Sequence, residues 1–255
     1  MRTFVISDAH GYPGLIQNAL DHGGFEPGRD AFVYAGDLFD RGPDPGGCID
    51  LVEDHATEVL MGNHDVAVLL DYIVYPQEPE NRGFQPLLID KVLNAGPSAA
   101  WKVATYIEGV LITHAGVSEA YEGVFQEECE SDPERLAAHL NQAFLTALRR
   151  EFETGEYDER GILGDDGPTW FRPRPYSRLL PLAGIRQVVG HTPSIPELEE
   201  RGFHMIDPCA FLGMDDPGRF RYAVIEDGWV RVEEGALLGS CEFSRREDSA
   251  AALCR

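Results

Sequence analysis

The chain has 255 residues, of which 43% are hydrophobic, so it can bury a substantial core, and disorder, collagen and coiled coil are excluded. Its 44 acidic side chains against 21 basic ones give a formal net charge of −23, which repels polyanions, so we expect no bulk binding of nucleic acid. No apolar run approaches the ~18 residues that a membrane span needs, so we expect no membrane contact and a cytoplasmic location.

The first third of the chain repeats one pattern, in which a short apolar strand runs into a polar loop and then into a helix. The expected strands are residues 3–6, 31–35 and 58–61, and the expected helices are residues 13–20, 43–53 and 66–73. Three such units in series predict a mostly parallel sheet with right-handed crossovers.

The remainder of the chain predicts further strands and two helical insertions, at residues 72–106 and 119–170. Helical patterning is expected at 87–93, at 99–106 and, as a long amphipathic helix, at 133–152. The expected strands are 109–113, 185–189, 203–206, 220–225 and 229–232, with a hairpin turn at Asp227-Gly228. We expect a single domain over residues 1–239, followed by a poorly ordered tail at 240–255.

The five cysteines are scattered and odd in number, and they form no C-x-x-C pattern. They are Cys48, Cys129, Cys209, Cys241 and Cys254. This arrangement predicts free thiols rather than a disulfide framework or a structural zinc site.

Polar clusters follow five of the expected strands. In chain order they are Asp8 with His10; Asp37 with Asp40 and Arg41; Asn63 with His64 and Asp65; His114; and His191. The carboxyl ends of parallel strands share one edge of a sheet, so we expect these side chains to converge there. Carboxylates, imidazoles and an amide oxygen suit Mn²⁺, Fe or Zn²⁺, and the donors suffice for two ions.

These motifs resemble, in order, those of the calcineurin-like metallophosphoesterases. They read Asp8-Ala9-His10-Gly11, Gly36-Asp37-Leu38-Phe39-Asp40-Arg41-Gly42, Gly62-Asn63-His64-Asp65, Thr113-His114-Ala115-Gly116 and Gly190-His191-Thr192. The Asp-Arg-Gly sequence resembles the phosphoprotein-phosphatase branch, which includes bacterial phosphatases and symmetric diadenosine tetraphosphatases. The resemblance covers roughly residues 1–225 and implies an α/β fold with two packed, mixed sheets flanked by helices. Ser7 and Asp65 depart from the common pattern, which has Gly and Glu there.

The resemblance also implies a site with two divalent metal ions. Asp8 and His10 would bind one ion, Asp37 would bridge both, and the second ion would take the remaining ligands, which are Asn63, His114 and His191. Mn²⁺ is the expected metal, with Fe or Zn²⁺ as alternatives. A hydroxide that bridges the ions would attack phosphorus directly, without a phosphoenzyme.

The resemblance implies catalytic roles for four further residues. His64 would be the general acid and Asp40 would hold its ring, while Arg41 and Arg172 would grip the phosphate oxygens. Arg174 and Arg178 are alternatives to Arg172, and Trp170 and Phe171 either pack beneath the site or stack on a substrate base.

The sequence therefore predicts a metal-dependent phosphatase that acts on phosphorylated proteins or small phosphate compounds, with no oligomeric state indicated. A symmetric diadenosine tetraphosphate hydrolase and a non-catalytic metal-binding regulatory protein remain alternatives. A nuclease of the same superfamily is disfavoured, because Thr192 and Pro193 follow His191 where those enzymes have a Gly-His-x-His sequence. Taken singly, Asp37 and Asp40 also suit ordinary turns, and the histidines suit packed loops.

Overall fold

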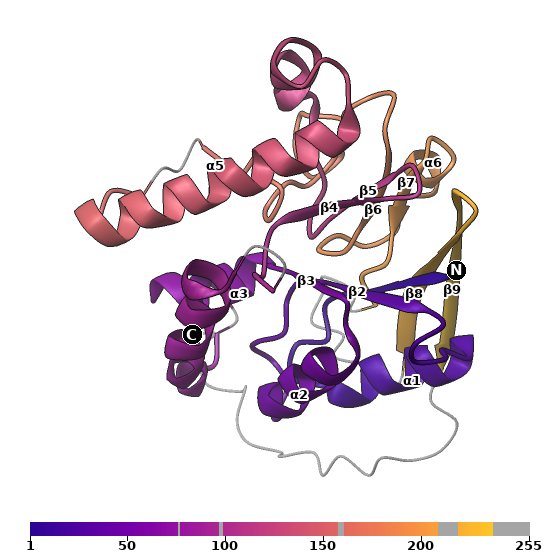
Figure 1. The fold of residues 1–255 in the computed structure, drawn as a ribbon, viewed down its shortest axis with the longest axis horizontal. Coiled ribbons are helices and arrows are strands. Elements are labelled where there is room, and N and C mark those ends of the chain that lie inside the picture. The colour runs from indigo at the N-terminus through magenta and orange to yellow at the C-terminus, as the bar shows by residue number, and fades with distance from the viewer. Residues whose placement is uncertain (76, 97–98, 158–160, 209–218, 237–255) are drawn as a thin grey trace, which may run out of the picture.

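The computed structural model describes residues 1–75, 77–96, 99–157, 161–208 and 219–236. Two β-sheets lie face to face at its centre, with helices on the outer sides (Figure 1). The five-stranded sheet has the order β3-β2-β1-β8-β9, formed by Glu58–Leu60, Ala31–Ala35, Thr3–Ile6, Arg219–Glu226 and Trp229–Ala236. The four-stranded sheet has the order β4-β5-β6-β7, formed by Ala104–Ile107, Val110–Thr113, Arg186–Val189 and Phe203–Met205.

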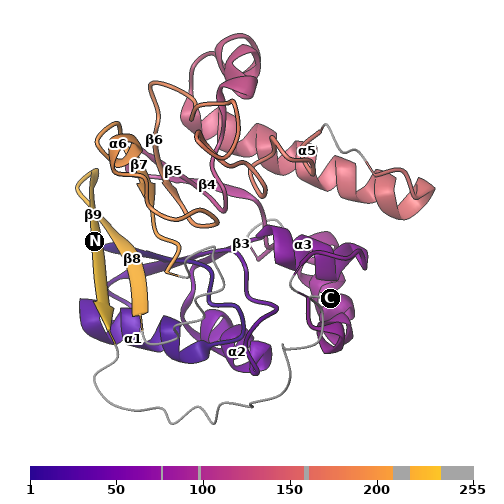
Figure 2. The ribbon, with the colours of Figure 1, turned by 180° about the vertical axis from the view of Figure 1, so that it is seen from behind.

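Helices cover both outer faces of this pair of sheets. Helices α1 (Pro13–Gly23) and α2 (Pro45–His55) lie against the first sheet, and α5 (Pro133–Thr154) lies beyond the second sheet (Figures 1 and 2). The other helical segments are α3 (Asn63–Leu70), η1 (Pro79–Phe84), α4 (Gln85–Ile89), η2 (Asp90–Asn94), η3 (Glu119–Tyr121), η4 (Val124–Glu128) and α6 (Pro196–Glu199).

The alternation of side chains along the strands explains this layering. Val5 and Val33 point between the sheets, where they join a buried cluster with Ile112 of β5. Their neighbours Phe4 and Phe32 point to the opposite face and join the core that includes the apolar residues of α1 and α2. Because both faces of β1 and β2 are buried, these two strands are nearly continuous apolar runs rather than alternating ones, whereas the edge strand β9 alternates.

The three predicted strand–loop–helix units are confirmed, and the first three strands pair in parallel, with β1 against β2 and β2 against β3. Beyond them the expectation of a mostly parallel sheet is only partly met, because β5 pairs parallel with β6 and β6 with β7, but three other pairs are antiparallel. Strand β8 pairs antiparallel with both β1 and β9, and β4 pairs antiparallel with β5. Both sheets are therefore mixed, as the family resemblance implies.

The helix expected at residues 99–106 is also wrong. Residues 97–98 are outside the described part, and Ala104–Ile107 form strand β4, whose Ala104 pairs with Thr113 of β5. The short apolar run suits either a helix or a strand, and pairing with β5 decides the outcome. Asn141 of α5 fixes this strand, because its side chain accepts hydrogen bonds from the backbone N–H groups of Val103 and Ala104.

Cys48 and Cys129 are free, as the sequence predicts, and both are buried. The other three cysteines and the predicted tail at 240–255 lie outside the described residues. Within the described ranges, no helix combines the length and the apolar character required to cross a bilayer.

Candidate metal centre

The predicted clusters converge at one end of the two sheets. A cavity of about 290 Å³ is lined by eight of the predicted site residues, which are Asp8, His10, Asp37, Arg41, Asn63, His64, Arg172 and His191. The other two, Asp40 and His114, are fully buried behind this lining and contact it through hydrogen bonds. Arg174 and Arg178, the alternatives to Arg172, are not among the described residues that line this cavity.

Left-handed backbone is concentrated in the loops that carry these residues. Six predicted site residues have positive φ angles, which are Asp8 (54°), His10 (45°), Asp37 (65°), Asp40 (71°), Arg41 (64°) and His191 (63°). This conformation costs a non-glycine residue about 1–3 kcal/mol and persists only where the surroundings fix it. Hydrogen bonds between the first two loops provide that constraint, because His10 N donates to Asp37 O at 3.0 Å and Gly11 N donates to Leu38 O at 2.8 Å.

Two motif glycines allow the carboxylates to approach the backbone. A Cβ atom on Gly62 would collide with Oδ1 of Asp37, and one on Gly190 would collide with Oδ2 of Asp8. A backbone N–H shortly after each glycine uses this close approach. The backbone N–H of His64 donates to Asp37 Oδ1 at 3.0 Å, and that of His191 donates to Asp8 Oδ2 at 3.1 Å.

A hydrogen bond to a carbonyl oxygen orients three of the imidazole rings. Nδ1 of His10 lies 2.7 Å from Phe39 O, Nδ1 of His114 lies 2.9 Å from Ala35 O, and Nε2 of His191 lies 3.1 Å from Trp170 O. A carbonyl oxygen can only accept, so each of these nitrogens carries a proton. In the neutral form of each ring, the opposite nitrogen therefore keeps its lone pair for a cation.

Asp37 is the centre of the donor set. Its Oδ2 lies 3.4 Å from Nε2 of both His10 and His114. Two groups of buried side chains could each hold a metal ion, and they share Asp37: one contains His10 and His64, the other His114 and His191. The structure thus supports a dimetal centre but adds His64 to one group, where the sequence interpretation has it as a proton donor.

The charge balance of the site also favours cations. Burial opposes the protonated form of His114, but the carboxylates of Asp37 and Asp8 outweigh burial and raise the pKa of His114 to about 10. Burial would raise the pKa of Asp37, yet the surrounding rings, His114 foremost, lower that pKa well below its usual value. The donors therefore fit two divalent ions in both type and charge.

His64 and Asp40 form a buried pair beside this centre. Nδ1 of His64 lies 2.5 Å from Oδ2 of Asp40, a residue with 0% exposure. The carboxylate holds one ring nitrogen, so the other nitrogen, Nε2, is available to the cavity that His64 lines. The sequence interpretation of Asp40 as the partner of His64 agrees with this contact.

The two predicted arginines differ in how much of their hydrogen-bonding capacity is used. Arg172 Nη1 donates to the backbone oxygen of His191 at 2.7 Å. Arg41 Nε is buried and has no hydrogen-bond acceptor among the described residues. A buried guanidinium N–H without an acceptor is costly, so Arg41 is suited to an anion in the cavity.

Some residues of the site have no role assigned from the sequence, although Asp65 belongs to the third polar cluster named there. Asp65 is fully buried, and its carboxylate accepts hydrogen bonds from the backbone N–H groups of Asp37, Leu38 and Gly62. It thereby ties the second loop to the third. Tyr75 and Asp207 line the cavity, and no motif marks either of them.

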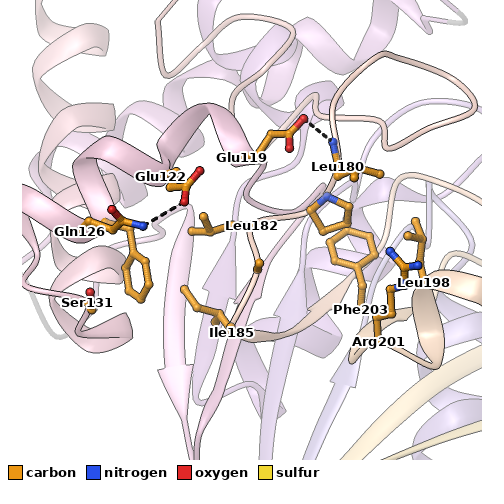
Figure 3. A pocket seen from close by; sticks show the side chains of 14 residues that line it. Glu119, Glu122, Gln126, Ser131, Leu180, Leu182, Ile185, Leu198, Arg201 and Phe203 are labelled. Carbon is orange, nitrogen blue, oxygen red and sulfur yellow. Dashed lines mark hydrogen bonds between the residues drawn. The ribbon is translucent and has the colours of Figure 1, made fainter.

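A second cavity, of about 350 Å³, contains none of the predicted site residues (Figure 3). Apolar side chains form much of its lining, including Phe125, Leu182 and Leu198. Glu119 and Glu122 also line it, and each already accepts a hydrogen bond, from Leu180 N and from Gln126 Nε2 respectively. Cavity size alone therefore does not identify the site.

Comparison with known proteins decides the family. The model of the calcineurin-like phosphoesterase family matches residues 1–209. The chain belongs to this family. Its members are metal-dependent hydrolases, which agrees with the two buried His/Asp groups around Asp37.

Two curated proteins are similar to this chain at low sequence identity or over a short segment. A symmetrical bis(5'-nucleosyl)-tetraphosphatase of Aggregatibacter actinomycetemcomitans is 23% identical over 151 residues, which cover 57% of this chain and 55% of that protein. Serine/threonine-protein phosphatase 1 of Salmonella typhimurium is 36% identical over 66 residues, which cover 26% of this chain and 31% of that protein. The chain thus spans about half or less of the length of these relatives.

A solved structure supports the fold. A protein serine/threonine phosphatase from Saccharomyces cerevisiae superposes with a TM-score of 0.56 at 13% identity, covering 95% of this chain and 82% of that one. The shared architecture is an α/β fold with two mixed sheets flanked by helices.

Proposed function

We propose that the protein is a two-metal-dependent phosphatase that hydrolyses phosphomonoesters of phosphorylated Ser/Thr proteins or of small phosphate compounds. One observation carries the proposal: the buried His64–Asp40 pair opens into the same cavity as the donor set centred on Asp37. Such a pair beside a metal centre provides proton transfer in addition to metal binding.

The metal ligands would be divided between two sites. Asp8 and His10 would hold one ion, Asn63, His114 and His191 the other, and Asp37 both. When bound, two divalent ions neutralise phosphate charge and lower the pKa of a water molecule between them. Mn²⁺ is the proposed metal, and Fe or Zn²⁺ would also suit this mixture of imidazole and carboxylate donors.

The remaining side chains would act on the substrate. His64 would deliver a proton from Nε2 to the departing alkoxide, while Asp40 holds Nδ1 at 2.5 Å and stabilises the charged ring. The guanidinium groups of Arg41 and Arg172, which line the same cavity, would bind the phosphate oxygens and stabilise the charge that develops on them.

A symmetric diadenosine tetraphosphate hydrolase is the second candidate. Two observations favour it: a curated relative has that name, and Tyr75 and Trp170 line the cavity. Tyr75 is 93% exposed at the opening, so its ring is free to stack on a base. Substitution of Tyr75 by Ala would then weaken hydrolysis of the dinucleotide but not of p-nitrophenyl phosphate.

A non-catalytic metal-binding regulatory protein is the alternative outside enzymology. Metal binding alone requires neither a buried His–Asp pair next to the ligands nor a buried guanidinium N–H that has no acceptor among the described residues. The presence of His64, Asp40 and Arg41 together supports the enzyme.

One set of assays tests these functions side by side. The protein is dialysed against a chelator, Mn²⁺ is added back, and hydrolysis is measured with p-nitrophenyl phosphate, bis-p-nitrophenyl phosphate, a phosphoserine peptide and diadenosine tetraphosphate. We expect Mn²⁺ to restore hydrolysis of the monoesters. Absence of activity on all four substrates, with the wild type equal to His64→Asn, would rule out the enzyme.

A further inference from the structure

The carboxylate of Asp40 has a second set of partners beyond His64. Its Oδ2 lies 2.5 Å from Nδ1 of His64, while its Oδ1 accepts hydrogen bonds from Nδ2 of Asn81 and from the backbone N of Glu78, both at 2.9 Å. Asn81 is 4% exposed and belongs to η1, a segment in which the sequence shows no catalytic motif.

We propose that Asn81 is a positioning residue for proton transfer: it fixes the plane of the Asp40 carboxylate and, through it, the direction in which His64 presents Nε2. The inference rests on the proposed function, because it concerns the proton donor of that reaction. Asn81 does not line the cavity that contains His64, so it acts through Asp40.

The geometry supports this role because a carboxylate rotates easily about its Cβ–Cγ bond. With both oxygens engaged by donors from different segments, the plane of the Asp40 carboxylate is set, and the ring of His64 is set with it. Removal of the Asn81 amide leaves Oδ1 of a fully buried carboxylate with the N–H of Glu78 as its remaining donor in the described contacts. The carboxylate is then free to turn toward other donors.

Helix α4, which follows η1 directly, offers a matched control. Gln85, at the start of α4, donates from Nε2 to the backbone oxygen of Leu69 at 3.0 Å and so ties the segment to α3. It makes no described contact with Asp40. A substitution at Gln85 therefore disturbs the attachment of the segment, whereas a substitution at Asn81 disturbs the His64–Asp40 pair.

The first test compares leaving groups. A good leaving group such as p-nitrophenolate depends little on a proton donor, whereas the alkoxide of a phosphoserine peptide depends on one. For Asn81→Leu we expect the factor by which kcat falls below the wild-type value to be about tenfold larger with the phosphopeptide than with p-nitrophenyl phosphate. The metal content should be unchanged. Gln85→Leu should lower both rates equally or neither.

The second test needs no metal and no turnover. In the chelator-treated protein, the proton on Nδ1 of His64 should give a downfield NMR resonance, assigned by its absence in His64→Asn. We expect this resonance in the wild type and in Gln85→Leu, and a shift or a loss by solvent exchange in Asn81→Leu. If Asn81→Leu does not fold, Asn81→Asp provides the test, because it keeps the shape and replaces the N–H donor by an acceptor.

The outcomes separate the inference from the proposed function. Equal losses with both substrates and an unchanged resonance in an active, folded Asn81 variant would overturn the role of Asn81. A wild type that hydrolyses none of the substrates would overturn the proposed function, and the NMR comparison would still decide whether Asn81 holds the pair.

Discussion

The cavity lined by the predicted site residues and the second cavity are similar in size, but they differ in the polar groups that their walls offer to a ligand. The cavity near the loops encloses about 290 Å³ and the one beside η4 about 350 Å³. In the first, buried carboxylates and imidazoles surround Asp37, and Arg41 Nε has no acceptor among the described residues. In the second, no described group of His, Cys, Asp or Glu side chains could hold a metal ion, and both glutamates already have partners.

The two cavities also differ in the backbone conformation of the residues that line them. Five described residues that line the first cavity are non-glycine residues with positive φ: Asp8, His10, Asp37, Arg41 and His191. Among the described non-glycine residues that line the second cavity, Ser131 alone has one, at 57°. Backbone strain together with buried, incompletely partnered polar groups therefore distinguishes a reactive site from a gap of similar volume.

The largest effect is expected for Asp37→Asn, because both donor groups share this carboxylate. The variant should lose bound metal and its phosphatase activity, by more than the ~10²–10⁴-fold that loss of a general acid costs. Metal content by elemental analysis and turnover of p-nitrophenyl phosphate check this. Glu122→Gln in the second cavity removes the same charge and should change neither quantity; retention of both metals in Asp37→Asn would contradict the sharing.

His64→Asn should lower turnover by about 10²–10⁴-fold while the metal content stays at the wild-type level. The reason is that Asp40 holds Nδ1 of His64, and in the proposed function the other nitrogen would serve proton transfer. Metal analysis beside kinetics decides the assignment. A loss of metal as large as that of Asp37→Asn would instead make His64 a ligand, as its grouping with His10 and Asp37 allows.

Arg41→Ala should lower kcat/KM by about 10²-fold, because the guanidinium group proposed to bind the phosphate is lost. Arg41→Lys keeps the charge but not the planar fork, so an intermediate loss is expected. Steady-state kinetics with p-nitrophenyl phosphate measure both variants. Equal activity of Arg41→Ala and the wild type would remove Arg41 from the phosphate site.

The second cavity should respond in stability rather than in activity. Leu182 is 4% exposed, so Leu182→Ala should destabilise the fold by about 2–5 kcal/mol without a change in kcat. Urea denaturation of the metal-free protein and kinetics at low temperature measure the two effects. A fall in kcat of Leu182→Ala under conditions where the variant is fully folded would show that the two cavities are coupled.

The smallest effect concerns an ion pair outside both cavities. The hydrogen bond from Arg2 lowers the pKa of Asp30 in the folded protein. The pair therefore stabilises the fold fully at pH values above the unfolded Asp pKa of about 4. This stabilisation is lost as the pH falls through the lower pKa of the folded state. Asp30→Asn should cost about 1 kcal/mol or less at pH 7, and the difference from the wild type should narrow toward pH 3. Thermal unfolding at both pH values checks the sign; a difference that widens on acidification would contradict it.

Local chemistry in the sequence was sufficient to predict the three strand–loop–helix units and the loops that carry the donor set. Each strand is a continuous apolar run that ends at a polar cluster, and parallel strands bring such clusters to one edge. The site residues predicted from the resemblance, His114 and His191 included, converge in the structure although they are distant in sequence.

Long-range pairing decided the rest. Residues 104–107 form a strand because β5 lies beside them, and β8 returns antiparallel to β1, neither of which follows from local apolar spacing. Asn81 reaches Asp40 from 41 residues away along the chain, and Asp65 likewise meets the backbone of Asp37 from 28 residues away. Periodicity and turn chemistry act between near neighbours, whereas the partners of a buried carboxylate depend on which segments the folded chain brings together.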